Sequence, residues 1–141
     1  MRQSLALVII APMVAGCAHA AALSANVAII AIHNQFTVSG QFAGSAGIDP
    51  LTQTVTLRVG AFSITIPAGS FQRDPIGHYV FGGNINGAQL AGSIWSQNGN
   101  RYLFGFTGRD AKGLPTVNPV EVHLAIGSYG GVASVTAKIE Q

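Results

Sequence analysis

The chain has 141 residues, of which 48% are apolar and 9% are charged, and it contains 18 glycines. Charged residues usually make up about 25% of a globular domain, and disorder requires high charge with low hydrophobicity, so this composition excludes a disordered chain. The formal net charge is +2 and the basic residues are scattered, which excludes a surface that neutralises several adjacent phosphates of a nucleic acid. The length fits one domain.

The first 20 residues have the pattern of a bacterial secretory signal. Arg2 precedes an apolar run from Leu5 to Val14, and small residues follow that run. An apolar run of this length is too short to anchor a protein across a membrane, but it is typical of a cleaved signal peptide. We therefore expect an exported protein with one mature domain over residues 21–141.

Two cleavage sites are open within this signal. The residues Val14-Ala15-Gly16-Cys17 resemble the lipobox of bacterial lipoproteins, in which the cysteine is lipid-modified, whereas Ala18-His19-Ala20 is a small-x-small site. Cys17 is the only cysteine, and lipidation would explain its presence in an exported chain. We favour the lipobox, which predicts an outer-membrane lipoprotein that meets the membrane only through Cys17. The other site predicts a periplasmic or extracellular protein.

Beyond Leu23 the apolar residues alternate with polar ones, which is the period of a β-strand. Eight or nine strands and no convincing helix predict an all-β domain, an antiparallel β-sandwich of immunoglobulin-like size, with a small β-barrel as the alternative. The connection Arg109–Pro119 is expected to cross between the sheets. The alternating segments are 26–33, 36–42, 55–59, 62–66, 78–85, 88–96, 102–106, 120–126 and 133–139.

Turn residues predict the pairing of the central strands. Gly60-Ala61 suits a two-residue type II′ turn that pairs Val59 with Phe62. Asn86-Gly87 is the strongest short hairpin signal, and it joins the next two strands.

A third hairpin is expected around Asn98-Gly99, but its register stays open. A two-residue turn places Ile94 opposite Leu103, whereas a loop one residue longer aligns Ile94 with the aromatic residues of the following strand.

Several short motifs carry a resemblance to a known domain: GIDP at 47–50, VTLRVG at 55–60, IPAGSF at 66–71, ING at 85–87 and NPV at 118–120. The chain is similar, from Leu23 to its end, to an uncharacterised all-β domain that recurs in exported proteins of environmental bacteria. The resemblance implies a fold and no activity, because each motif consists of turn or strand residues. Relatives often carry acidic residues where this chain has Ser128 and Tyr129, so the resemblance implies no cation site in that loop.

The sequence offers no arrangement of residue types that points to catalysis or to a metal. Strand periodicity places His123 on an outward face beside Glu121, and no two histidines lie within five residues of each other. We therefore expect no enzyme, no metal and no cofactor. Three aspartates stand one to a loop, where such side chains commonly cap the turn: Asp49, Asp74 and Asp110.

Aromatic residues are the most suggestive candidates for ligand binding. Phe104 and Phe106 are expected in the core, whereas Trp95 and Tyr102 are amphipathic and are the candidate ligand-binding residues. Aromatic rows on a sheet can stack on sugar rings or hold a partner strand.

These observations predict a non-enzymatic structural or binding module of the envelope or the extracellular space, whose partner is an unknown protein or glycan. Recognition would use a sheet face or the loops Gly44–Pro50, Phe71–Gly77 and Arg109–Pro119. The first alternative is a carbohydrate or small-ligand binder built on Trp95 and Tyr102. The second is a hydrolase that uses a histidine and a loop aspartate.

Overall fold

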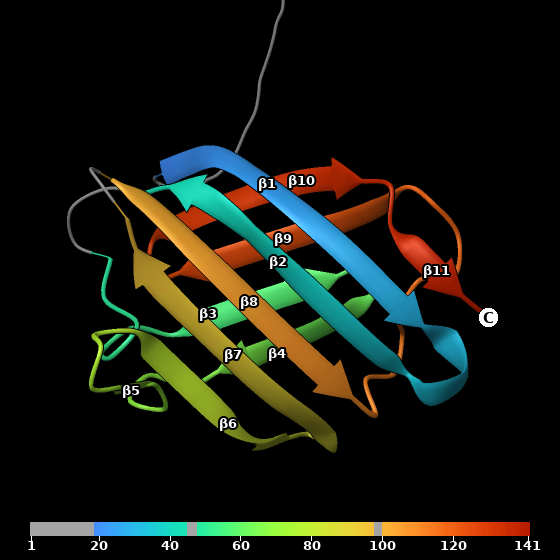
Figure 1. Ribbon diagram of the computed structural model, residues 1–141, viewed down its shortest axis with the longest axis horizontal. Helices are drawn as coiled ribbons and strands as arrows, with labels where there is room; N and C mark the ends of the chain where they lie inside the picture. The colour runs from blue at the N-terminus through green and yellow to red at the C-terminus, as the bar shows by residue number, and fades with distance from the viewer. Residues whose placement is uncertain (1–18, 45–47, 98–99) are drawn as a thin grey trace, which may run out of the picture.

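A computed structural model describes residues 19–44, 48–97 and 100–141 of the chain (Figure 1). The fold is all-β, as predicted, and the one helical element in these residues is a turn of 3-10 helix, Ala31–His33. In the described ranges, no helix is long and apolar enough to cross a membrane. The predicted lipobox at 14–17, with Cys17, lies outside the described residues.

The strands in chain order are β1 (His19–Ile30), β2 (Gln35–Ala43), β3 (Val55–Val59), β4 (Phe62–Ile66), β5 (Gln72–Arg73), β6 (Tyr79–Ile85), β7 (Ala88–Ser96), β8 (Arg101–Arg109), β9 (Val120–Ile126), β10 (Tyr129–Val135) and β11 (Lys138–Glu140).

These strands form one mixed sheet in the order β4-β3-β9-β10-β1-β2-β8-β7-β6-β5, and β11 pairs with β1. Residues 19–22 of β1 pair in parallel with β10, whereas residues 23–30 pair antiparallel with β2. We call β1, β2, β8, β7, β6 and β5 the front limb, and β10, β9, β3 and β4 the back limb. The two limbs lie one over the other with crossed strands (Figure 1), so the sheet curls into a half-barrel.

The half-barrel differs from the predicted sandwich because its limbs are not two separate sheets. The 12-residue strand β1 runs through both limbs and connects them. Full closure into a barrel is also absent among the described strands, since β4 and β5 end the strand order without pairing with each other. The connection between β8 and β9 crosses from the front limb to the back limb, as predicted for Arg109–Pro119.

Local turn residues produce the first two hairpins in the predicted register. Val59 pairs with Phe62, and the φ of 61° at Gly60 suits the first position of a type II′ turn. Asn86 and Gly87 have φ values of 53° and 87°, and a type I′ turn requires this left-handed conformation at both positions.

In the third hairpin, the structure shows which of the two registers left open by the sequence is formed. Ile94 pairs with Phe104 rather than with Leu103, so the longer of the two connections joins β7 and β8. The residues Asn98-Gly99 themselves lie outside the described part of the chain.

Two predicted strands differ most from their boundaries in the structure. The first strand covers His19–Ile30 rather than 26–33, and the predicted last strand is interrupted after Val135. Asn118 accounts for the interruption, because its side-chain oxygen accepts the Ala137 amide at 2.7 Å and its side-chain nitrogen donates to the Ala137 carbonyl at 3.0 Å. At Ala137, the Asn118 side chain thus makes the backbone hydrogen bonds that a neighbouring strand would otherwise make.

The core lies between the two limbs. Phe36 of the front limb and Phe62 of the back limb have ring centroids 5.4 Å apart. In the described residues, no charged residue is buried, and the buried side chains are apolar apart from the Tyr129 hydroxyl, so the core is held by apolar packing. The largest fully buried side chains, which include the predicted core residues Phe104 and Phe106, are Phe36, Phe42, Phe104, Phe106, Ile29, Leu57, Ile66, Ile94, Leu124, Ile126, Val38 and Val55.

Tyr129 joins the back limb to the end of β2 through a buried phenol. Its hydroxyl donates a hydrogen bond to the Ala43 carbonyl at 2.9 Å, and burial raises the pKa of Tyr129 to about 12. The folded state therefore holds this proton more tightly than the unfolded chain does, where the pKa is about 10. The resulting stabilisation is complete below about pH 10 and is lost as the pH rises through about 12.

Tyr129→Phe is expected to lower the free energy of unfolding at neutral pH by about 1 kcal/mol, because it removes one hydrogen bond. Above about pH 10 the wild type should lose stability faster than the variant, which has no phenol to ionise at this position. Urea unfolding at neutral pH and across the alkaline range measures both effects. The same pH dependence in both proteins would contradict the assignment.

Candidate functional site

The side of the front limb that points away from the core, which we call the outer face, carries very little charge. Strands β6, β7, β8, β2 and β1 contain no Asp, Glu or Lys, and their only charged residues are Arg101 and Arg109 at the two ends of β8. The two-residue edge strand β5 of the same limb adds Arg73. The outer face, as alternation and register place it, includes Ser24, Asn26, Ala28, Ile30, Gln35, Thr37, Ser39, Gln41, Ala43, Val80, Gly82, Asn84, Gln89, Ala91, Ser93, Trp95, Arg101, Leu103, Gly105, Thr107 and Arg109.

Three shallow hollows follow one another along the outer face, and together we call them the groove. The first has a volume of about 600 Å³ and contains Arg109, the second, of about 470 Å³, includes Gly105, and the third, of about 380 Å³, includes Trp95. Neighbouring hollows share lining residues, which makes the groove continuous: Ala91 and Thr107 between the first two, and Ser39 between the last two.

The groove exists because small residues occupy the middle of the outer face. Gly82 and Gly105 lie on β6 and β8, and a Cβ added to either would meet no atom within 4 Å. A glycine inside a strand usually costs stability, because it gives the strand no side chain to pack. Open space at both positions indicates that neither glycine is required by the packing of the core.

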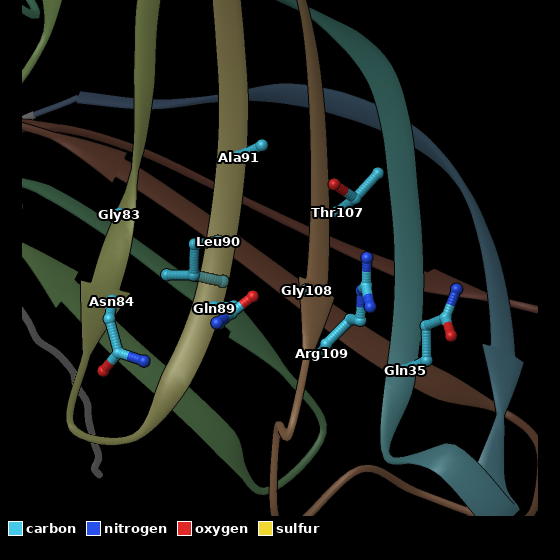
Figure 2. Close-up of a pocket in the computed structure, with 9 residues that line it drawn as sticks. All are labelled: Gln35, Gly83, Asn84, Gln89, Leu90, Ala91, Thr107, Gly108 and Arg109. Carbon is cyan, nitrogen blue, oxygen red and sulfur yellow. The ribbon is translucent and has the colours of Figure 1, made fainter.

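At one end of the groove, three amide side chains and one guanidinium form a row across four strands. Asn84 pairs with Gln89, and Gln89 pairs with Arg109. Figure 2 shows the Arg109 side chain between Gln89 of β7 and Gln35 of β2. The side-chain oxygen of Asn84 accepts the Gly87 amide at 3.2 Å, which directs its NH₂ group to other partners. The row therefore concentrates N–H donors on an exposed surface.

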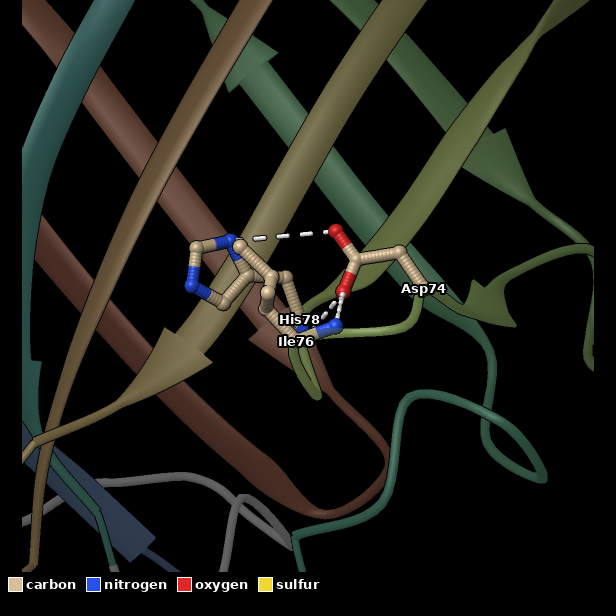
Figure 3. Close-up of polar contacts among 3 residues, drawn as sticks. All are labelled: Asp74, Ile76 and His78. Atoms are coloured by element: carbon tan, nitrogen blue, oxygen red, sulfur yellow. Dashed lines mark hydrogen bonds and ion pairs between the residues drawn. The ribbon is translucent and has the colours of Figure 1, made fainter.

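At the other end of the groove, Trp95 is held by a chain of contacts. The rings of Trp95 and His78 stack with centroids 5.0 Å apart and planes 19° apart. His78 is positioned by Asp74, whose Oδ1 accepts the backbone amides of His78 at 2.8 Å and of Ile76 at 3.1 Å (Figure 3). The indole is thus supported from one side by a fixed imidazole ring.

Tyr102, the second predicted ligand-binding residue, lies on the opposite side of the sheet from Trp95. Register explains the separation, because Trp95 pairs with Leu103 and Tyr102 pairs with Ser96. The Tyr102 ring stacks on Phe42 with centroids 5.2 Å apart and planes 4° apart. Trp95 and Tyr102 therefore do not form one platform for a ligand.

His78 and Asp74 are the histidine and loop aspartate that come closest to the predicted hydrolase pair. Their Nδ1 and Oδ2 atoms lie 4.0 Å apart, which is too long for a hydrogen bond. The other Asp74 oxygen is already occupied by backbone amides. Asp74 therefore acts as a turn-capping residue, as loop aspartates were expected to act.

His123 lies on the outside of the back limb, as predicted, with its Nε2 3.0 Å from Oε1 of Glu121. The hydrogen bond and charge of His123, with a smaller contribution from Arg58, hold the pKa of Glu121 below its usual value. Glu121 is exposed, so this pair is a solvated surface contact of small energetic weight.

The motifs behind the family resemblance have structural roles wherever the structure describes them. Asp49 accepts the Leu51 amide at 3.0 Å in the first motif, and Phe71 of IPAGSF is buried against Phe81 with ring centroids 5.7 Å apart. Tyr129 is buried and its neighbour Ser128 is exposed in the turn. In the described residues, no group of three or more His, Cys, Asp and Glu side chains could hold a metal ion.

Sequence reasoning missed the polar row around Arg109. The Asn86-Gly87 turn already implies that Asn84 faces Gln89, so half of the row is readable from local sequence. Its completion by Arg109 depends on the register of the third hairpin, and Gln35 is added by a pairing of β2 with β8 that spans some 70 residues of sequence.

No protein-family model, curated protein or solved structure matches this chain.

Proposed function

We propose that this chain is an exported, non-enzymatic binding module of the bacterial cell envelope, and that it binds its partner with the outer face of the front limb. The observation that carries this proposal is the groove, which runs from Arg109 to Trp95. Hydroxyl and amide side chains line it together with small and apolar residues, which predominate in the middle hollow, and no carboxylate lines it. Side chains fixed on strands lose little conformational freedom when a ligand binds, which favours recognition by such a face.

A carbohydrate is the partner that the groove favours. Amide and hydroxyl side chains hydrogen-bond sugar hydroxyls, and an aromatic ring stacks on the apolar face of a sugar. Trp95 is half-buried at the end of the groove, where stacking on His78 fixes its ring. Tyr102 lies on the core side of the sheet. The proposed carbohydrate site therefore consists of Trp95 and the polar side chains of the groove, without Tyr102.

Gly105→Gln is expected to reduce glycan binding about tenfold or more, because its side chain enters the open middle of the groove. Trp95→Ala should weaken binding by a similar factor through the loss of stacking. Gly130→Gln is the matched control, since Gly130 lies in β10 of the back limb and also has open space around its Cβ position. Binding to a glycan array, with wild-type and variant chains at equal concentration, measures all three.

Two results would count against this surface. Binding that survives Gly105→Gln unchanged would place the site elsewhere, and equal losses in Gly105→Gln and Gly130→Gln would indicate a general effect on folding. Circular dichroism of each variant separates the second case from a local effect at the groove.

For the localisation of the protein, we propose a lipoprotein that is cleaved at the lipobox and lipidated on Cys17. The backbone pairing of β1 supports this choice, because His19 and Ala20 pair with Tyr129 and Gly130 of β10. A cut after Ala20 would remove both residues from the strand, whereas a cut before Cys17 retains them. Labelling with radioactive palmitate should mark the wild type and not Cys17→Ser, and label that persists in the variant would overturn the lipoprotein proposal.

A further inference from the structure

We infer that the groove binds a polysaccharide whose sugars carry carboxylates, and that Arg109 with its neighbouring amides binds one of these carboxylates. This inference rests on the proposed function and adds the chemical class of the ligand to it.

The charges around the groove favour an anionic ligand. The five strands that form the outer face supply two arginines and no acid. Among the described residues, neither of the two ion pairs involves Arg109. At the outer edge, β11 adds Lys138 and Glu140 beside β1, and these two charges cancel. An anion that approaches the Arg109 end of the groove is therefore attracted by Arg109 without repulsion from a carboxylate on these strands. The Asp74 carboxylate lies in a loop beside His78, at the Trp95 end.

The row around Arg109 suits a carboxylate in particular. A guanidinium donates two parallel hydrogen bonds to the two oxygens of a carboxylate, and such charge-assisted pairs are shorter and stronger than neutral ones. The amides of Gln35, Gln89 and Asn84 lie along the same row, and they supply further donors for the carboxylate or for adjoining sugar hydroxyls.

The length of the groove indicates a polymer rather than a single sugar. Arg101 and Arg109 are eight positions apart on β8, which corresponds to about 27 Å at about 3.4 Å per residue. The three hollows are continuous from Arg109 to Leu103, which is six positions or about 20 Å of this length. Hydroxyl and amide side chains line them together with small and apolar residues. A nucleic acid has more closely spaced phosphates, which two separated arginines would leave largely unneutralised.

Polygalacturonate and its fully methyl-esterified form provide a matched pair of probes, because they share a backbone and differ in the carboxylates. Affinity electrophoresis or calorimetry with the mature chain should show about tenfold or stronger binding of the free acid. Arg109→Gln should reduce binding of the acid about tenfold or more, while binding of the methyl ester changes less than about twofold. Arg109 is exposed, so the variant is expected to fold.

Charge variants at the two open glycines separate a site on the outer face from general attraction to a basic protein. Gly105→Glu and Gly130→Glu change the net charge equally, and both Cβ positions are open. Gly105→Glu should abolish binding of polygalacturonate, whereas Gly130→Glu should reduce it less than about threefold. Poly-L-glutamate, which carries carboxylates without sugars, should bind at least about tenfold more weakly than polygalacturonate.

Each opposite result overturns the inference. Equal binding of the acid and the ester, both lost in Gly105→Gln, would retain the groove as a carbohydrate site and reject the carboxylate. Equal losses in the two Glu variants, or equal binding of poly-L-glutamate, would show attraction to net charge alone. An absence of polygalacturonate binding also rejects the inference, and the glycan array then decides whether the proposed function falls with it.

Discussion

Phe42→Ala is expected to lower the free energy of unfolding by about 3–5 kcal/mol, the usual cost of emptying a buried aromatic site. Phe42 is 1% exposed and lies where the front limb meets the back limb. Its ring centroid is 4.9 Å from that of Tyr129, 5.2 Å from that of Tyr102 and 6.1 Å from that of Phe104. Removing the ring therefore takes away contacts with three aromatic rings on two other strands, β8 and β10.

Because the stability of a domain is commonly about 5–15 kcal/mol, this variant should be close to unfolded at physiological temperature. Guanidinium unfolding followed by circular dichroism measures the loss. Val132→Ala is the control, since Val132 is 53% exposed on β10 and should change stability by less than about 0.5 kcal/mol. A difference between Phe42→Ala and the wild type of under about 1 kcal/mol would contradict the described core.

Gly40→Ala is expected to destabilise the fold, whereas Gly105→Ala should leave it unchanged or slightly more stable. A Cβ on Gly40 would clash with the Ser24 carbonyl oxygen and lie 2.9 Å from the Cα of Ala25. Both atoms belong to the backbone of β1, so the clash requires β1 to move away from β2. Such overpacking typically costs about 1–3 kcal/mol, and sometimes more.

Gly105 is the matched control because it lies in β8, the strand next to β2, and has open space around its Cβ position. There a methyl group adds no clash and reduces the freedom of the unfolded chain, which favours folding by up to about 1 kcal/mol. Unfolding midpoints in urea should therefore shift in opposite directions. Midpoints that fall by the same amount in both variants would mean that the close approach of β1 and β2 is not the cause.

The sequence was most informative where the determinants of structure are local. Gly60 and Asn86-Gly87 adopt the positive φ values that their hairpins require, and the alternating residues around them then follow the turn. The core positions Phe104 and Phe106 were also predicted, because a chain with 8% aromatic residues needs most of them in its core. The polar pair His123–Glu121 also follows from strand period alone.

Features that depend on distant residues were not predictable. The alternation around Asn26–Ile30 marks a strand, but it does not reveal that the strand begins at His19 and pairs with residues near the end of the chain. Trp95 and Tyr102 look alike in sequence, and a single residue of loop length decides that they face opposite sides. The same difference of one residue in loop length sets the register that pairs Arg109 with Gln89 and so places it in the row of amides.

The position of β1 has a consequence for the order in which the chain acquires its structure. β1 is the first of the described strands to be synthesised, so it meets its parallel partners β10 and β11 last. The junction between the limbs therefore has to wait for residues 129–140, and contacts of such high sequence separation are slow to form. A chain built in this way completes its junction between the limbs only after its C-terminal strands have been synthesised.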